Sequence, residues 1–190
     1  MKSDTIAAIA TALSDAGIGI IRISGPEAIA VANRVVVNKK KEHTLKNWQT
    51  HTIHYGFVEE NGTILDEVMV SVMKAPRSYT TEDTVEINCH GGVLLTKRVL
   101  EAVLHAGARM AEPGEFTKRA FLSGRIDLSE AEAVMDLIQA KNQFSMQASI
   151  KQLRGSVAEK VKSLRAALLY EIAFIESALD DPEHILSLIH

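Results

Sequence analysis

The sequence changes character at Pro113 and Gly114, and this change limits the possible folds more than any other feature. Upstream, short β-branched runs alternate with segments of helical periodicity, whereas the downstream sequence is helical almost to its end. Proline lacks the backbone N–H that strands and helix interiors need, and glycine adds a second break. The pattern therefore predicts a mixed domain over residues 1–113 and the first part of a helical domain over residues 114–190.

The upstream part combines strands and helices in an order that predicts an α+β domain. The segment from Gly17 to Gly25 is β-branched and bounded by glycines, which is typical of a strand. Asn61-Gly62 is a strong hairpin signal between two alternating apolar segments. The other strands are expected over residues 52–58, 64–73, 84–88 and 108–111, and helices after Pro26 and over residues 93–105.

Downstream of the break, helix signals follow one another closely. A short helix is predicted from Glu115 to Leu122, because Ser123-Gly124 is typical of a helix C-terminus. A capping box then begins a second helix, and Asp127 with Glu130 fits that pattern as well as Ser129 with Glu132 does. This helix is expected to run as one element over residues 128–153, before Gly155 separates it from a last helix over residues 156–179.

The last helix carries one continuous apolar stripe at nearly the ideal helical period. The stripe consists of Val157, Val161, Leu164, Leu168, Ile172, Ile175 and Leu179. We expect the two long helices to fold back on each other as an antiparallel pair. Two helices cannot bury their stripes fully, so the pair needs further helices, a sheet face or a partner chain.

Composition excludes several classes of protein. The net charge of -3 argues against a dedicated nucleic-acid binder, although it allows a local basic patch. The single cysteine, Cys89, excludes a disulfide framework and favours a reducing cytoplasm. Residues 1–10 lack the basic start and the long apolar run of a signal peptide, so none is expected there, and no apolar run approaches transmembrane length.

The residue spacing in this sequence does not fit the common catalytic and metal-binding motifs. No G-x-x-x-x-G-K-[ST] loop occurs, so this chain alone is not expected to hydrolyse a nucleotide. Cys89 and His90 are adjacent on a predicted strand, where successive side chains point to opposite faces, and a small buried thiol is the favoured interpretation. The seven histidines show no metal-ligand spacing, and no metal site is predicted.

Two groups of charged residues remain as binding candidates. The segment after Pro113 contains three basic residues, Lys118, Arg119 and Arg125. The spacing favours a solvated connector, and the alternative is an anion-binding corner. Glu86 lies on the polar face of a predicted strand and by default faces solvent. A carboxylate on a rigid strand can also accept the paired N–H groups of a flat heterocycle.

Several motifs together resemble one family, the tRNA-modification GTPases called MnmE or TrmE. The matching stretches span nearly the whole chain in family order: Asp4 to Ala8, Gly17 to Gly25, Asp66-Glu67, Thr81 to Asp83, Glu86 to Gly92, Pro113 to Leu122, Asp127-Leu128 and Ala131 to Ala133. The run Pro-Gly-Glu-Phe-Thr-Lys-Arg-Ala-Phe-Leu is the longest of them. Leu179 to Glu183 also resembles the family's I-D-[FY]-P-E junction, with Asp181 in place of the aromatic residue.

The resemblance implies an N-terminal domain similar to folate-binding aminomethyltransferase domains. In the family this domain dimerises and binds 5-formyltetrahydrofolate, or a related reduced folate, at the dimer interface. Carried over position by position, the folate contacts fall on Arg22, Glu86 and Arg125. A carboxylate such as Glu86 suits the amino group and ring N–H of a pterin, and arginine suits the carboxylates of the folate tail.

The resemblance also implies partners and a setting for the full-length family. With the flavoprotein MnmG, the homodimeric GTPase modifies the wobble uridine of certain tRNAs in the cytoplasm. GTP, potassium and magnesium belong to a domain inserted into the helical domain, and this sequence carries no motif of that domain. We therefore expect a fragment of a longer protein or a truncated relative, inactive as a GTPase by itself.

Two other functions remain open at this level. A plain RNA-binding module would use the basic cluster Lys39 to Lys41 with Lys118 and Arg119, and its affinity would fall steeply with salt. A purely structural dimerisation fragment would bind no folate at all. The charge balance weakens the first of these, and the presence of Arg22, Glu86 and Arg125 weakens the second.

Overall fold

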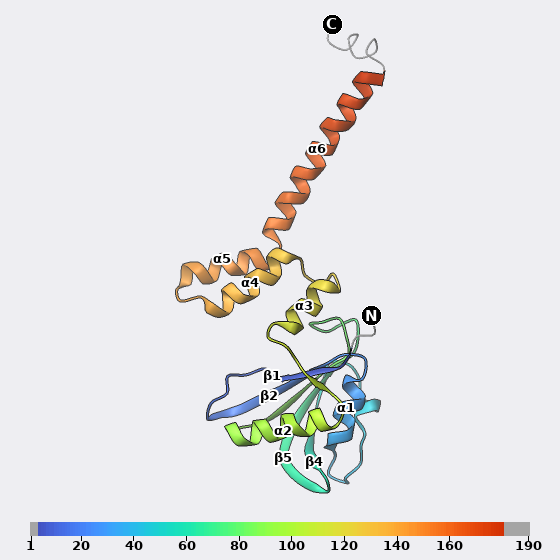
Figure 1. Ribbon diagram of the computed structural model, residues 1–190, viewed down its shortest axis with the longest axis vertical. Coiled ribbons are helices and arrows are strands. Elements are labelled where there is room, and N and C mark those ends of the chain that lie inside the picture. The colour runs from blue at the N-terminus through green and yellow to red at the C-terminus, as the bar shows by residue number, and fades with distance from the viewer. Residues whose placement is uncertain (1–3, 181–190) are drawn as a thin grey trace. The chain divides into compact units, whose positions relative to one another are not determined.

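The computed structural model describes residues 4–180 and contains both sheet and helices, so the predicted α+β class is confirmed (Figure 1). The chain divides into two compact units, the first ending at Arg125 and the second beginning at Ile126. The helix α3 thus belongs to the first unit, although the predicted domain boundary precedes Gly114. The elements of the first unit are β1 (Ile6–Ile9), β2 (Ala16–Ser24), α1 (Ala28–Val35), β3 (Val36–Val37), the short 3-10 helix η1 (Leu45–Asn47), β4 (Thr52–Glu60), β5 (Thr63–Met73), β6 (Thr84–Gly91), α2 (Val93–His105), β7 (Arg109–Met110) and α3 (Glu115–Leu122).

The first unit is built on one mixed sheet with the strand order β3-β4-β5-β6-β2-β1-β7. All pairs are antiparallel except β1 with β7, which is parallel. The helices α1 and α2 pack on one face, where alternate residues of the central strands, such as Ile21, Val70 and Ile87, are fully buried. Because side chains alternate along a strand, the residues between them form a second face, which we call the open face.

Local sequence signals predicted most of the helices and strands of this unit correctly. The bounds of α2 and α3 are those predicted, and the hairpin turns at Asn61-Gly62 with both residues at positive φ. The short apolar segment from Thr5 to Ala10 is compatible by sequence with a strand or a helix start, and it forms a strand over Ile6–Ile9 because it pairs with β2 and β7. The helix after Pro26 ends at Val35 because Val36 pairs with Val58 in the sheet.

The second unit corrects one prediction. The helix expected to run unbroken over residues 128–153 is two helices, α4 (Leu128–Gln139) and α5 (Gln143–Leu153), and the last helix is α6 (Ser156–Asp180). Asn142 begins α5 because its side chain accepts from the Ser145 N–H, which is an N-cap. The pair that folds back is therefore α4 with α5, and not the 128–153 segment with the last helix (Figure 1).

The ends of these helices follow the predicted capping signals. Of the two capping boxes that fit the sequence, the one between Asp127 and Glu130 forms, with Asp127 Oδ1 accepting from the Glu130 N–H at 2.8 Å. Gly155 has a φ of 77°, which glycine adopts at little cost, and it separates α5 from α6 as expected. The family-like junction after Leu179 continues into residues 181–183, which lie outside the described part of the chain.

The apolar stripe of α6 exists as predicted, and its seven side chains are exposed by 43% to 76%. An apolar stripe that long normally packs against another element. Within residues 4–180, no helix combines the length and the apolar character needed to cross a lipid bilayer.

Candidate functional site

The open face of the sheet places two of the predicted site residues side by side. Arg22 on β2 lies opposite Glu86 on β6, and Glu86 lies opposite Ser71 on β5. Arg22 Nε donates to Glu86 Oε1 at 2.8 Å, and the two side chains are exposed by only 31% and 22%. The glutamate is therefore not the freely solvated residue that the strand pattern alone favours.

The third predicted residue, Arg125, reaches the same region from the end of α3. Its guanidinium carbon lies 5.0 Å from the centre of the Tyr79 ring, and Nη1 donates to the Tyr79 carbonyl at 2.9 Å. The guanidinium carbon of Arg22 lies 6.0 Å from the same ring. Within the first unit, Arg22 and Arg125 thus both lie against the ring of Tyr79, and Glu86 is connected to them through Arg22.

Two aromatic residues of this site were not predicted. Tyr79 lies in the loop between β5 and β6, and its hydroxyl is 3.0 Å from Thr117 Oγ1 on α3. Phe116 on α3 places its ring centre 5.6 Å from the Arg22 guanidinium carbon. Rings at these distances attract a guanidinium through their π faces and limit its orientations. The sequence pattern does not indicate a role for a tyrosine in a polar loop. The position of Tyr79 in the site depends on the packing of α3, which is distant in the sequence.

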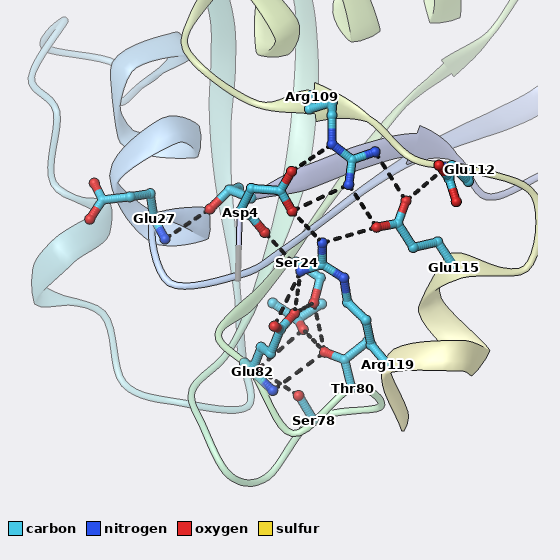
Figure 2. A network of polar contacts seen from close by, with 12 residues as sticks. Asp4, Ser24, Glu27, Ser78, Thr80, Glu82, Arg109, Glu112, Glu115 and Arg119 are labelled. Carbon is cyan, nitrogen blue, oxygen red and sulfur yellow. Dashed lines mark hydrogen bonds and ion pairs between the residues drawn. The ribbon is translucent and has the colours of Figure 1, made fainter. Parts of the chain in front are cut away.

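A network of ion pairs connects α3 to Asp4 shortly before β1, to β7 and to the loop before β6 (Figure 2). Arg119 on α3 donates to Asp4 Oδ1 at 2.8 Å, to Glu82 Oε2 at 3.1 Å and to Glu115 Oε1 at 3.0 Å. Arg109 next to β1 contacts Asp4 at 2.6 Å and Glu115 at 2.7 Å. Arg119 is therefore part of a fixed structural network, and the interpretation of this residue as a solvated connector or an anion-binding group is wrong.

The network lowers the pKa of two of its carboxyl groups. Hydrogen bonds from Arg109 are the largest cause for both, and those from Arg119 add to them. The pKa of Asp4 falls to about 2, and that of Glu115 also falls to about 2. A carboxyl group with a depressed pKa in the folded state stabilises the fold above its unfolded pKa, and this contribution is lost as the pH falls toward the folded value.

The first unit should accordingly lose stability in acid over a defined range. We expect the urea midpoint, followed by fluorescence of Trp48, the chain's only tryptophan, to stay level down to about pH 5 and to fall between about pH 4.5 and pH 2. Glu115→Gln should be less stable at neutral pH and show a smaller fall in this range. The exposed Glu112→Gln is the matched control and should keep the parent's acid dependence. Identical curves for Glu115→Gln and the parent would contradict the account.

Cys89 and His90 do not form a catalytic pair. The Cys89 side chain is buried, its Sγ donates to the Gly19 carbonyl at 3.3 Å, and burial raises the pKa of the thiol. His90 lies on the open face, with its ring Nδ1 2.7 Å from Asp66 Oδ1, and this hydrogen bond raises the pKa of the imidazole. The predicted opposite orientation of the two side chains is confirmed. Within residues 4–180, no three His, Cys, Asp or Glu side chains are grouped closely enough to hold a metal ion.

Comparisons with known proteins identify the same two parts of the chain. The family model of the GTP-binding protein TrmE N-terminus matches residues 5–125, and that of the MnmE helical domain matches residues 128–189. The two matches meet between residues 125 and 128, and the boundary between the two compact units, after Arg125, lies at the same place.

Relatives of high identity carry one common name, tRNA modification GTPase MnmE. The protein of Lachnoclostridium phytofermentans is 60% identical over 185 residues, which cover 97% of this chain and 40% of the relative. Those of Listeria welshimeri and Carboxydothermus hydrogenoformans are 52% and 51% identical, again over 97% of this chain and 40% of each relative. This sequence thus spans about 40% of the length of these relatives. The chain belongs to the MnmE (TrmE) family of tRNA modification GTPases and corresponds to the N-terminal part of its members.

Proposed function

We propose that the first unit binds a reduced folate, 5-formyltetrahydrofolate, on the open face of its sheet. The observation that carries this proposal is that Arg22 and Arg125 both lie against the ring of Tyr79, while Arg22 also contacts Glu86. In this arrangement Glu86 accepts from the amino group and ring N–H of the pterin. Arg22 holds that carboxylate in place through Nε, and Tyr79 and Phe116 offer aromatic faces beside it.

The folate carries the reactive one-carbon unit, and the protein binds and orients it. Arg125 reaches the site from outside the sheet and is suited to a carboxylate or carbonyl of the folate tail. We assign no acid, base or nucleophile to Arg22, Glu86 or Arg125. Their role is to position the cofactor for a redox partner.

Within the longer proteins of the family, the unit supplies this folate to a tRNA-modifying assembly. We propose that the chain forms a homodimer and acts in the cytoplasm with the flavoprotein MnmG on the wobble uridine of tRNA. GTP, potassium and magnesium would act in a part of the relatives outside this sequence. Support for self-association comes from exposed apolar residues of the open face, since Ile18, Ile53 and Met69 are exposed by 61%, 62% and 53%.

Calorimetric titration with (6S)-5-formyltetrahydrofolate tests the proposal. We expect saturable binding with one ligand for each chain. Lys97→Ala, on the helix that covers the opposite face of the sheet, should leave it unchanged. Absence of binding would refute the folate proposal. Tight tRNA binding that weakens steeply with salt, without folate binding, would favour an RNA-binding module instead.

A further inference from the structure

A basic cavity of about 610 Å³ lies beside the proposed folate site. It is lined by Met73 at the end of β5, by the loop that carries Arg77 and Tyr79, by Arg125 after α3, and by His51. All of these residues belong to the first unit. The cavity thus shares Tyr79 and Arg125 with the proposed folate site, while Arg77 and His51 take no part in that site.

The charge of the cavity favours an anionic ligand. Two arginines and one histidine line it, and none of the residues that line it is acidic. Within residues 4–180, neither Arg77 nor Arg125 has a carboxylate partner. The last carbonyl groups of α3 would oppose an anion, but those of Arg119, Ala120 and Phe121 accept backbone N–H groups of the turn that follows. The two guanidinium groups therefore dominate the local charge.

The position of the cavity relates it to the pterin site. Met73 pairs with Thr84, and Ser71 pairs with Glu86, so both pairs lie on the open face of the sheet. Ser71, which lies opposite Glu86, and Met73 are two residues apart on β5, a step of roughly 7 Å along the strand. The wall formed by Met73 is therefore close to Glu86 on the same face of the sheet. A folate whose pterin lies on Glu86 and whose first glutamate meets Arg125 would have its next substituents at this cavity.

We propose that the cavity binds the γ-linked glutamates that follow the first one, so that the unit prefers folates with a polyglutamate tail. This inference rests on the proposed folate function and extends it to the class of folate that is bound. Each additional γ-linked glutamate brings one α-carboxylate, and a guanidinium can hold a carboxylate through two parallel hydrogen bonds. Arg77 is the specificity-determining residue, and His51 contributes a further ring N–H.

The test compares the monoglutamate and pentaglutamate forms of 5-formyltetrahydrofolate in calorimetric titrations at physiological salt. The Arg77 ion pair and the His51 hydrogen bond are individually weak, and together they should favour the pentaglutamate by about tenfold in affinity in the parent. Arg77→Ala should reduce this preference to about threefold or less and leave the monoglutamate affinity within about twofold of the parent's. The matched control Lys97→Ala makes the same change of charge on the other side of the sheet and should keep the full preference.

Each other outcome has a defined meaning. Equal affinities of the parent for the two forms would overturn the polyglutamate inference and leave the folate proposal intact. An equal loss for both forms in Arg77→Ala would overturn it too, because Arg77 would then act on the folate core or on the fold. A similar loss of preference in Lys97→Ala would reduce the effect to general charge attraction and also overturn it. Failure of the parent to bind either form would refute both proposals together.

Discussion

Arg119→Ala is expected to lower the free energy of unfolding of the first unit by roughly 3 kcal/mol, because the substitution removes the mostly buried cation of the ion-pair network. The Arg119 side chain is exposed by 12%, and the side chains of its partners Glu82 and Glu115 are exposed by 21% and 10%. Without the guanidinium, these carboxylates lose a charge partner where water replaces it poorly. The midpoint of thermal unfolding should fall by roughly 10 °C.

Fluorescence of Trp48 provides the measurement, because the ring packs against the core of the first unit and reports on this unit alone. Lys118→Ala is the matched control, since Lys118 is the neighbouring cation on α3 and its side chain is exposed. It should change the midpoint by no more than about 2 °C. If both variants unfolded at the parent's temperature, the ion-pair network would not contribute to the stability of the first unit, and the account would be contradicted.

Glu86→Gln should weaken binding of 5-formyltetrahydrofolate by roughly tenfold to a hundredfold. The substitution keeps the shape of the side chain and leaves an oxygen that can accept from Arg22 Nε. It replaces the second acceptor oxygen by an NH₂ group, which would face the donors of the pterin edge. A donor that meets a donor in a partly buried site leaves both unsatisfied, and the lost charge weakens the remaining hydrogen bond.

Calorimetric titration measures this change, and a control must separate binding from folding. Glu101→Gln makes the same chemical change on α2, where the side chain is exposed, and should leave the affinity unchanged. Unfolding of Glu86→Gln followed through Trp48 should resemble that of the parent. A stable Glu86→Gln variant with the parent's affinity would remove Glu86 from the site, even if the chain binds folate.

Most of the fold could be predicted from local patterns. The Asn61-Gly62 hairpin, the helix over residues 93–105 and the turn at Ser123-Gly124 depend on neighbouring residues, and the structure contains each of them. The break at residues 140–142 was missed because apolar residues recur on both sides of it at helical spacing. One local signal of the break is Asn142, whose capping role depends on a hydrogen bond to the Ser145 N–H.

The candidate site could be predicted only in part, because its contacts join distant segments. Family motifs led to Arg22, Glu86 and Arg125, but the strand pattern alone would place Glu86 in solvent. The role of Arg119 depends on Asp4, Glu82 and Glu115 meeting at one point, and Asp4 lies 115 positions before it in the chain. No periodicity encodes such a meeting of charges, and the same applies to the ring of Tyr79 between β5 and β6.

The central claim is that Glu86 binds the pterin edge, and a cycle of two ligands and two proteins tests it most directly. The affinities of 5-formyltetrahydrofolate and of its analogue without the pterin 2-amino group would be measured for the parent and for Glu86→Gln. We expect loss of the amino group to weaken binding to the parent by about tenfold or more, and binding to Glu86→Gln by about threefold at most. An equal ratio of the two affinities in both proteins would show that Glu86 does not contact the pterin amino group, and it would contradict the account.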